Sequence, residues 1–413
     1  MIHLRKTYID KITEALKLVP IVVLIGARQV GKTTIMKNLP LNKVCVFLDA
    51  QDPEVAERFK KKSLIENYLK IHINPELNGF LLIDEFQYID NISVFLKLLV
   101  DHNPNLKIIC SGSSGINVIQ NVKESMAGRV RMINVYSLSL SEYLMFKDKA
   151  LSDIFSKYDL NTEYENIEPE IKQFLNEYLI YGGMPRLALT DNTEQKAELL
   201  EDIYKTYLLR DVRSFIRNED FVGFNKLLRL LASQAGNMVN INNLSKECSL
   251  SYKKTEEYLY IIEQMYIIQL IEPFHSNRKK VITKMRKVFF TDTGLRNIIL
   301  GNMNALEKRT DKGELTENFV LLEIRRKLLN HYKVYYYRTL DGSEVDFIVD
   351  NMKKLIPVEV KHSAFNRIKN LKNLNAFIET HKTDNPYVVN KNLNMVNNNT
   401  HFIPYVLAEK LKF

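Results

Sequence analysis

The segment at residues 26–33 constrains this chain more than any other part of its sequence. It reads Gly-Ala-Arg-Gln-Val-Gly-Lys-Thr, follows directly on the apolar run at residues 21–25, and leads into a helical pattern. Two glycines let the backbone wrap so tightly that successive amide groups point toward one centre, which forms a cradle for phosphate groups. A surface turn that matched by chance would lack the buried strand before it and the helix after it. We therefore expect a strand, a phosphate loop and a helix in this order.

The last two residues of the loop have separate chemical tasks. Lys32 is placed to reach the β and γ phosphate oxygens of a nucleoside triphosphate, and the hydroxyl of Thr33 is a suitable ligand for Mg²⁺. The preceding residues contribute mainly backbone amides to such a site. The expected nucleotide-binding residues of the loop are Gly26, Ala27, Arg28, Gln29, Val30, Gly31, Lys32, Thr33 and Thr34.

Four further strand candidates follow the loop, at residues 43–48, 79–83, 106–110 and 129–135. They are short apolar runs that alternate with helical patterns, which predicts an α/β fold with a parallel sheet covered by helices. The third of the five strands ends in Asp84 and Glu85. At the carboxyl end of such a strand, Asp84 is placed to hold the hydration shell of Mg²⁺ and Glu85 to polarise the attacking water. An ordinary surface Asp-Glu pair is the alternative.

The next strand ends in Ser111-Gly112-Ser113-Ser114. We expect Ser113 to be a polar sensor near the γ phosphate, with Ser111 as the second choice; a plain polar loop is the alternative. A separate strand with a polar sensor is the layout of the AAA+ ATPases. Recognition of GTP would need an Asn-Lys-x-Asp motif, and its one partial look-alike lies at residues 381–384, in a different part of the chain.

Together these motifs resemble the prokaryotic AAA+ ATPases that carry a C-terminal domain of formerly unknown function and are related to the STAND ATPases. The resemblance rests on residues 26–33, 82–87, 111–114, 127–129, 139–143 and 181–185. It implies that the cofactors are ATP and Mg²⁺. It also implies that Pro185, in Gly183-Met184-Pro185, packs near the adenine from a helical lid. Taken alone, that segment is simply a turn that breaks a helix.

An arginine is expected to complete the ATPase site, either from the lid or from a neighbouring subunit, because it would stabilise transition-state charge. The candidates are Arg129, Arg186 and Arg210. Arg210 is adjacent to Asp211, which favours a local ion pair for it. We rank Arg129 first.

Residues 216–300 follow the pattern of a winged helix-turn-helix. Helical patterns at 224–232, 241–248 and 251–262 precede two strand candidates at 267–271 and 287–291. Ser251 is a suitable cap for the third helix, so Lys253 and Lys254 would stand at its exposed first turn. The intervening segment 278–287 holds basic residues and no acidic one, among them Arg278, Lys279 and Lys280. These lysines and arginines are the expected DNA-binding residues. The alternative is a module that packs against the nucleotide site as a switch.

Residues 301–413 bring three acidic residues and a lysine into ordered context. Glu317 lies in a helical pattern, Asp346 in a strand candidate, and Glu359 and Lys361 in the next strand candidate. Adjacent hairpin strands would let the carboxylates hold Mg²⁺ while Lys361 orients a nucleophilic water. The arrangement resembles the PD-(D/E)xK restriction-endonuclease-like nucleases, although Val345 stands where that motif has proline. An ordinary polar-edged hairpin is the alternative.

Length and composition limit the remaining possibilities. A chain of 413 residues divides into several domains, and we expect an AAA+ core at 1–150, a helical lid at 151–215, the winged helix at 216–300 and the nuclease-like domain at 301–413. The net charge of +9 favours an anionic partner. The three cysteines are too widely spaced for a zinc site. No apolar run is long enough to span a bilayer, so we expect a cytoplasmic protein without a membrane partner.

The leading hypothesis is an ATP-hydrolysing switch whose nucleotide state repositions the winged helix and the nuclease-like domain on DNA. A second is a regulatory or scaffolding ATPase whose C-terminal domain is inert and serves interactions only. A third is a ring-forming DNA motor. A homo-oligomer or a switch-partner protein is compatible with these hypotheses.

Overall fold

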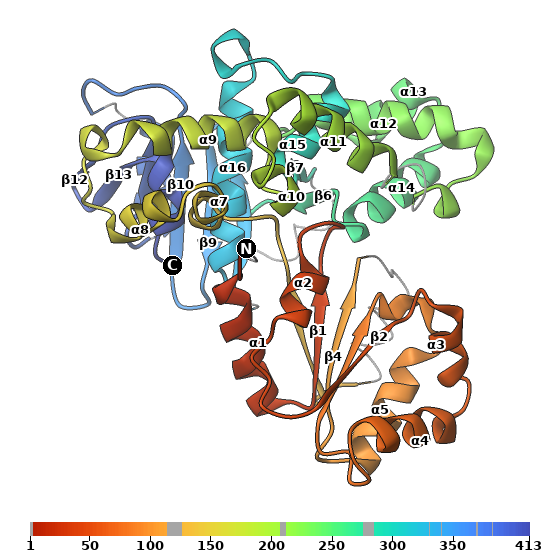
Figure 1. Cartoon of the computed structure of the whole chain (residues 1–413). Coiled ribbons are helices and arrows are strands. Elements are labelled where there is room, and N and C mark those ends of the chain that lie inside the picture. The colour runs from red at the N-terminus through yellow and green to blue at the C-terminus, as the bar shows by residue number, and fades with distance from the viewer. Residues whose placement is uncertain are drawn as a thin grey trace. The chain divides into compact units, whose positions relative to one another are not determined.

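The computed structural model describes residues 3–113, 126–206, 212–275, 285–329, 331–339, 341–368, 371–381 and 383–413. The chain forms two compact units (Figure 1). The first comprises Met1–Tyr136 with Gln264–Tyr266, and the second comprises Ser137–Glu263 with Ile267–Phe413. No helix in the described ranges combines the length and the apolar character that crossing a membrane requires.

The first unit is built on a five-stranded sheet with the order β2-β3-β4-β1-β5. All neighbouring strands are parallel, which confirms the parallel sheet expected from the sequence. Both β1 and β3 are buried along their whole length, which explains why their sequences are continuous apolar runs. The strands are β1 (Ile21–Ile25), β2 (Cys45–Asp49), β3 (Phe80–Asp84), β4 (Lys107–Gly112) and β5 (Val130–Asn134).

Helices cover both faces of this sheet. Alternate residues of β1 point to opposite faces, so Val23 belongs to one apolar core and Val22 to the other. The core of Val22 includes Ile12 and Ile35, whereas the core of Val23 is closed by the other helices. The helices are α1 (Lys6–Leu18), α2 (Lys32–Lys37), α3 (Pro53–Arg58), α4 (Lys62–His72), η1 (Phe86–Tyr88) and α5 (Ile92–His102).

The second unit contains a two-stranded antiparallel sheet, β6-β7, and a six-stranded mixed sheet with the order β12-β13-β11-β10-β9-β8. The helices are α7 (Leu140–Lys147), α8 (Lys149–Lys157), η2 (Tyr164–Asn166), α9 (Pro169–Tyr181), α10 (Pro185–Ala188), α11 (Thr193–Thr206), η4 (Arg213–Phe215), η5 (Asn218–Asp220), α12 (Phe221–Ser233), α13 (Ile241–Cys248), α14 (Tyr252–Gln264), α15 (Thr293–Leu300), η7 (Leu306–Lys308), α16 (Lys312–Lys327), α17 (Lys372–His381) and η8 (Tyr405–Lys410). The strands are β6 (Ile268–Ile271), β7 (Lys287–Phe290), β8 (Lys333–Arg338), β9 (Glu344–Asp350), β10 (Leu355–Val360), β11 (Tyr387–Asn390), β12 (Met395–Asn397) and β13 (Thr400–Pro404).

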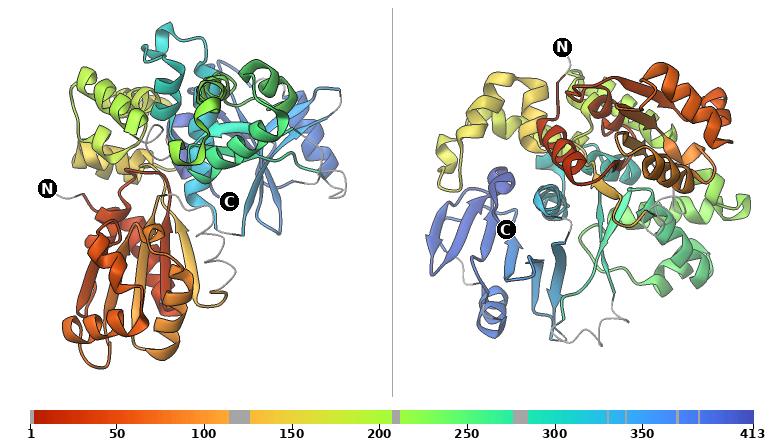
Figure 2. Two further views of the ribbon diagram at one scale, coloured as in Figure 1. Left: turned by 90° about the vertical axis from the view of Figure 1, so that its right-hand side faces the viewer. Right: turned by 90° about the horizontal axis from the view of Figure 1, so that it is seen from below.

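Helices α16 and α17 cover the two faces of the six-stranded sheet, whose strands are drawn in blue in Figures 1 and 2. Phe319 and Leu321 of α16 pack with Phe347 on one face. On the other face, Phe377 of α17 packs with Ile348. Successive side chains of β9 therefore point to opposite faces of the sheet and contribute to the apolar core on each face.

The boundary between the two units differs from the domain boundary expected at residue 150. Leu138, Leu140 and Tyr143 are fully buried in the same core as Phe319 of α16. These apolar side chains follow the last strand of the first sheet, and the second unit provides their cover. The helices expected to form a lid thus share one core with the C-terminal sheet.

Candidate functional site

The phosphate loop connects β1 to α2 at the carboxyl edge of the parallel sheet. Gly26 has a φ of 155°, and a Cβ at this position would overlap the carbonyl oxygen of Val135. Gly31 has a φ of 92° and lies immediately before α2, in the left-handed region that glycine adopts readily. Both glycines of the motif are therefore required by the backbone geometry of the loop.

Asp84 and Thr33 lie in direct contact at this edge. The hydroxyl of Thr33 donates to Oδ2 of Asp84 over 2.7 Å, and Ser111 of β4 donates to Oδ1 of the same carboxylate. Asp84 is only 6% exposed. The structure thus brings together the two residues predicted to serve Mg²⁺, and their oxygen atoms are the ligand type that this ion prefers.

Lys32 lies inside the loop that it is predicted to serve. Its ammonium group donates to the carbonyl oxygens of Gly26 over 2.9 Å and Ala27 over 2.7 Å. Burial lowers the pKa of Lys32 to about 8, against the opposing effect of the nearby Glu85 and Asp84 carboxylates. An anionic phosphate in the loop would favour the charged form of this lysine and raise its pKa.

Glu85 is held by two polar side chains beyond the end of β3. Its Oε2 atom accepts a hydrogen bond from Ser113 over 3.0 Å and another from Gln87 over 2.5 Å. The structure therefore places Ser113, the predicted sensor, against the predicted catalytic carboxylate. The sequence analysis did not assign a role to Gln87, although its position two residues after Glu85 could have indicated one.

Gly112 leaves space for the side chain of Gln87, because a Cβ at position 112 would lie 2.7 Å from Gln87 Oε1.

Arg5 is a second residue that the sequence reasoning missed. Its guanidinium donates to the carbonyl oxygens of Val30 over 2.9 Å and Tyr136 over 2.7 Å, which ties the phosphate loop to the end of the sheet. No motif marks this arginine in the sequence. Of the remaining loop residues, Ala27 and Val30 are buried, Arg28 is half-buried, and Gln29 and Thr34 are exposed.

The structure does not bring Arg129 to the phosphate loop of its own chain. Its carbonyl oxygen accepts from the amide of Ile21, so it lies at the amino edge of the parallel sheet, whereas the loop lies at the carboxyl edge. Its Nε atom donates to Asp101 over 2.6 Å. Arg129 therefore cannot complete this site within the chain, and only a role toward a neighbouring subunit stays open. Arg210 lies outside the described residues.

Pro185 is the first residue of α10 in the second unit. The preceding turn packs against α15, because the amide of Gly183 donates to Asp292 over 2.9 Å and Gly182, with a φ of 82°, leaves no room for a Cβ beside the same carboxylate. Burial raises the pKa of Asp292, and these backbone hydrogen bonds oppose the shift. The contact of Pro185 with adenine stays a prediction.

The structure brings Asp346, Glu359 and Lys361 together in the second unit. Strands β9 and β10 are antiparallel, and the amide of Val360 donates to Asp346 over 2.7 Å. Lys361 forms an ion pair with Glu359 at 2.5 Å. Burial raises the pKa of Glu359 to about 7, with a further contribution from Asp346. Burial would lower the pKa of Lys361, but Asp346 and Glu359 outweigh it and raise that pKa.

Glu317 of α16 pairs with Lys287, a residue of the basic segment 278–287 that was expected to face DNA. Lys287 of β7 is buried, and its ammonium lies 3.4 Å from Glu317 and 2.5 Å from Glu344. Burial raises the pKa of Glu317 to about 8, although Lys287 opposes the shift. Lys287, the last residue of the basic segment expected to face DNA, thus points into the protein. Across the described residues, no three His, Cys, Asp or Glu side chains are arranged to hold one metal ion.

The predicted DNA-binding residues fall into three groups. Lys253 is exposed at the first turn of α14, which Ser251 caps by accepting from the amide of Lys254 over 3.2 Å. The ammonium of Lys254, by contrast, pairs with Asp220 at 2.5 Å, so its charge is largely compensated. The third group, Arg278, Lys279 and Lys280, lies outside the described residues.

Comparison with known proteins adds three domain matches. Residues 19–144 match the family described as an AAA domain. Residues 172–306 match a domain of unknown function (DUF8612), and residues 312–407 match a second one (DUF4143).

Two similar proteins are themselves uncharacterized. One, from Methanocaldococcus jannaschii, is 29% identical over 386 residues, which cover 90% of this chain and 82% of that protein. The other, from Mycobacterium tuberculosis, is 24% identical over 364 residues, which cover 87% of this chain and 74% of that protein. Among solved structures, a Walker-type ATPase of Pyrococcus abyssi is 14% identical, with a TM-score of 0.49 and coverage of 72% of this chain and 96% of that one.

The parallel sheet, the phosphate loop and the AAA-domain match together define the class of the first unit. It is an AAA-type P-loop ATPase domain that binds nucleotide. The two matches in the second unit carry no assigned function.

Proposed function

We propose that this chain is an ATP-hydrolysing switch that uses Mg²⁺ and acts on DNA through its second unit. The observation that carries the ATPase part is the contact of Thr33 with Asp84 beside the buried Lys32. These three groups are the lysine, the hydroxyl and the carboxylate that phosphoryl transfer in P-loop enzymes requires.

Each residue of the proposed site has a task that follows from its contacts. Thr33 and Asp84 would hold the metal ion and its water shell, and bound Mg²⁺ would neutralise charge on the β and γ phosphates. Glu85 orients and polarises the attacking water, while Ser113 and Gln87 hold its carboxylate in place. Arg129 of a neighbouring subunit remains the candidate for stabilising transition-state charge, and this role would require a homo-oligomer.

The proposed action on DNA rests on two features of the second unit. Exposed Lys253 stands at the first turn of the third helix in the helix-turn-helix pattern. The cluster of Asp346, Glu359 and Lys361 lies at the end of a β-hairpin, with Glu317 on the neighbouring helix. We infer that nucleotide turnover changes how these two parts engage a duplex.

A second candidate function is favoured by Lys287. Its ammonium forms an ion pair with Glu317. A metal-dependent nuclease would need this carboxylate unpaired, so that it can bind the metal ion. In this candidate the C-terminal domain is catalytically inert, and the chain is a regulatory or scaffolding ATPase.

The ATPase rate with and without duplex DNA tests the leading proposal. Glu85→Gln keeps the shape of the side chain but removes its charge, so we expect turnover to fall by about 10²-fold or more while ATP binding persists. Ser156→Ala, at an exposed helical position of the second unit, is the control and should turn over like wild type. Equal rates in wild type and Glu85→Gln would contradict the assignment of Glu85. A rate that DNA leaves unchanged would remove the support for coupling between the ATPase and DNA.

A further inference from the structure

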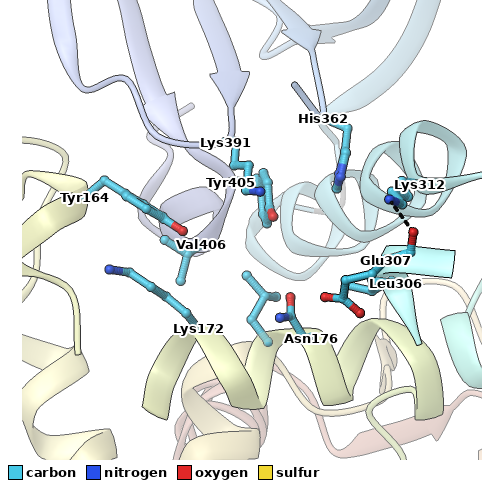
Figure 3. A pocket seen from close by; sticks show the side chains of 11 residues that line it. Tyr164, Lys172, Asn176, Leu306, Glu307, Lys312, His362, Lys391, Tyr405 and Val406 are labelled. Carbon is cyan, nitrogen blue, oxygen red and sulfur yellow. Dashed lines mark hydrogen bonds between the residues drawn. The ribbon is translucent and has the colours of Figure 1, made fainter. Parts of the chain in front are cut away.

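A pocket in the second unit contains none of the site residues discussed so far. Figure 3 shows its lining side chains, which come from η2, α9, η7, α16, η8 and the segments that follow β10 and β11. These segments lie far apart in the sequence and are brought together by the shared core of the second unit. The cavity volume is about 220 Å³.

The base of the pocket is apolar. Leu175, Leu306 and Val406 are buried side chains that line it, and the ring of Tyr405 is buried beside them. Apolar walls with a few convergent polar groups are typical of sites for small organic ligands. A ligand for this pocket therefore needs an organic part as well as a polar group.

Three lysines give the pocket its charge. Lys172, Lys312 and Lys391 all line it, and Glu307 is the one carboxylate side chain among its described lining residues. Lys312 donates to the backbone carbonyl of Glu307 over 3.1 Å, and Lys172 lies 4.1 Å from the centre of the Tyr164 ring. Neither contact brings a negative charge to the lysine.

His362 adds a further nitrogen to the same wall. Its ring stacks on Tyr405 at 5.8 Å, and Nδ1 lies 2.8 Å from the hydroxyl of Thr316. Thr316 gives its one hydroxyl hydrogen to the carbonyl oxygen of Lys312 over 2.8 Å, so Nδ1 must donate to Thr316. In the neutral ring Nε2 is then a hydrogen-bond acceptor, which suits a hydroxyl group on the organic part of a ligand and not a phosphate oxygen. Burial lowers the pKa of His362, and the charges of Lys391 and Lys312 lower it further. The ammonium groups of Lys391 and Lys312 are therefore close enough to His362 to affect its charge.

We propose that this pocket binds a phosphomonoester, with the phosphate held by Lys172 and Lys391 and the organic part over the apolar base. Ammonium groups are donors only, which suits a group whose oxygens all accept hydrogen bonds. A dianionic phosphate compensates two lysines at once, which a single carboxylate does not. The proposal does not depend on the ATPase or the DNA function of the chain.

The test must exclude binding to the phosphate loop, so it uses the full chain carrying Lys32→Ala. Ribose 5-phosphate is titrated against this protein by isothermal titration calorimetry, with ribose as the uncharged counterpart. We expect only the phosphorylated sugar to bind. Lys172→Ala and Lys391→Ala should each weaken its binding at least about tenfold through the loss of a charge-assisted hydrogen bond. Lys353→Ala, an exposed lysine in the turn between β9 and β10, is the control and should leave binding unchanged.

A second arm identifies the source of the phosphate. A short 5′-phosphorylated oligonucleotide and its unphosphorylated form are titrated against the same proteins. Preference for ribose 5-phosphate assigns a small metabolite, whereas equal or tighter binding of the phosphorylated strand end assigns a nucleic acid terminus. The proposal is overturned if neither phosphorylated probe binds, or if the Lys172→Ala, Lys391→Ala double variant binds as tightly as its parent. Lys391 is exposed, so its substitution does not threaten the fold.

Discussion

At the scale of single residues, the ATPase site combines backbone strain with hydrogen bonds that hold it. Glu85 has a φ of 50°, in the left-handed region that residues other than glycine rarely adopt. Strain of this kind persists where neighbouring contacts hold it, and it is frequent at active sites. Ser113 and Gln87 provide those contacts through the Glu85 carboxylate. This geometry supports a catalytic role for Glu85.

Gly26→Ala tests the phosphate loop at the same scale. The added Cβ would overlap the backbone of Val135, so the loop must shift, and we expect ATP affinity to fall by more than about tenfold with a stability loss of about 2–3 kcal/mol. Gly128→Ala is the matched control, because open space surrounds that position. An alanine at its φ of 78° should lower the free energy of unfolding by only about 1 kcal/mol. Titration with a fluorescent ATP analogue and thermal denaturation measure both effects, and equal behaviour of the two variants would contradict the packing argument.

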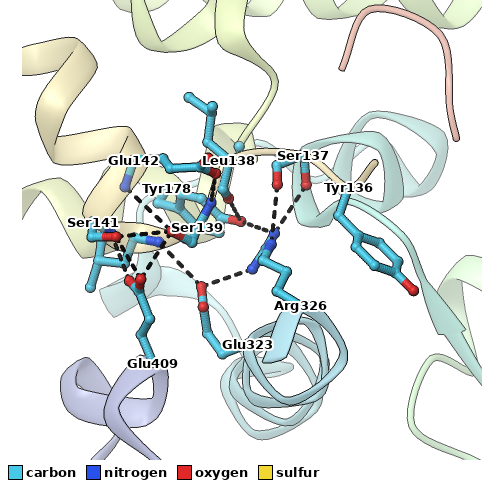
Figure 4. Close-up of polar contacts among 12 residues, drawn as sticks. Tyr136, Ser137, Leu138, Ser139, Ser141, Glu142, Tyr178, Glu323, Arg326 and Glu409 are labelled. Atoms are coloured by element: carbon cyan, nitrogen blue, oxygen red, sulfur yellow. Dashed lines mark hydrogen bonds and ion pairs between the residues drawn. The ribbon is translucent and has the colours of Figure 1, made fainter. Parts of the chain in front are cut away.

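At the scale of elements, polar contacts between distant segments determine where helices of the second unit begin. Ser139 caps α7 in a capping box with Glu142, and Glu409 near the C-terminus accepts hydrogen bonds from Ser139 and Ser141 (Figure 4). Arg326 of α16 donates to the carbonyl oxygen of Ser137 over 3.1 Å. The motif at residues 139–143 is therefore explained by the docking of α7 against the C-terminal segments.

The start of α16 leads to a prediction about pH. Asp311 pairs with the buried Arg296 at 2.5 Å and with Arg309 at 2.7 Å. Burial would raise its pKa, but the hydrogen bonds from Arg309 and Arg296 outweigh burial and lower that pKa to about 2. A lowered carboxyl pKa stabilises the fold above the unfolded-state pKa, and this stabilisation disappears as pH falls through about 2.

Asp311→Asn should therefore lower the free energy of unfolding by about 1–2 kcal/mol at pH 7, after allowance for solvent screening. The difference from wild type should narrow below about pH 4, where the unfolded-state carboxyl is protonated. Thermal denaturation across this pH range measures the effect. Asp384→Asn, which removes a partner of the exposed Lys354, is the control and should change stability by less than about 1 kcal/mol. A difference for Asp311→Asn that does not depend on pH would contradict the role of its charge.

At the scale of the whole molecule, Lys287 connects two parts of the second unit that we predicted from the sequence as separate domains, at 216–300 and 301–413. It extends from β7, in the expected winged helix, to Glu317 of α16 and Glu344 of β9 in the expected nuclease-like domain. Any movement of β7 away from α16 would break this ion pair. The contact therefore provides a physical link between the DNA-binding proposal and the carboxylate cluster.

Metal-dependent DNA cleavage tests this link. If Lys287 restrains the cluster, Lys287→Met should increase Mg²⁺- or Mn²⁺-dependent cleavage relative to wild type, because Glu317 becomes available to the metal. Adding Asp346→Ala to that variant should abolish cleavage, and Lys353→Met should behave like wild type. Absence of cleavage in every variant would support the inert domain of the second candidate function. Cleavage that survives Asp346→Ala would indicate a contaminating nuclease.

Local pattern was sufficient to predict the parallel sheet of the ATPase domain and several side chains that meet at its carboxyl edge. The loop at residues 26–33, the strand that ends at Asp84 and the serines after β4 are contiguous motifs, and the carboxyl ends of parallel strands always meet at one edge. The hairpin of Asp346 and Glu359 was predictable as well, because its two antiparallel strands are close in sequence. Arg5 carries no comparable signal, because it acts through backbone carbonyls of residues far along the chain.

The amino-acid sequence by itself determined the phosphate loop, the parallel sheet and the order of the helices, since these depend on residues close in sequence. Only the tertiary structure decided that Arg129 lies at the opposite edge from the loop and that Lys287 turns inward to Glu317. It also decided that residues from 138 onward join the C-terminal core, and that three distant lysines line one pocket. The physical reason is that burial and charge pairing act between segments whose separation in sequence carries no pattern.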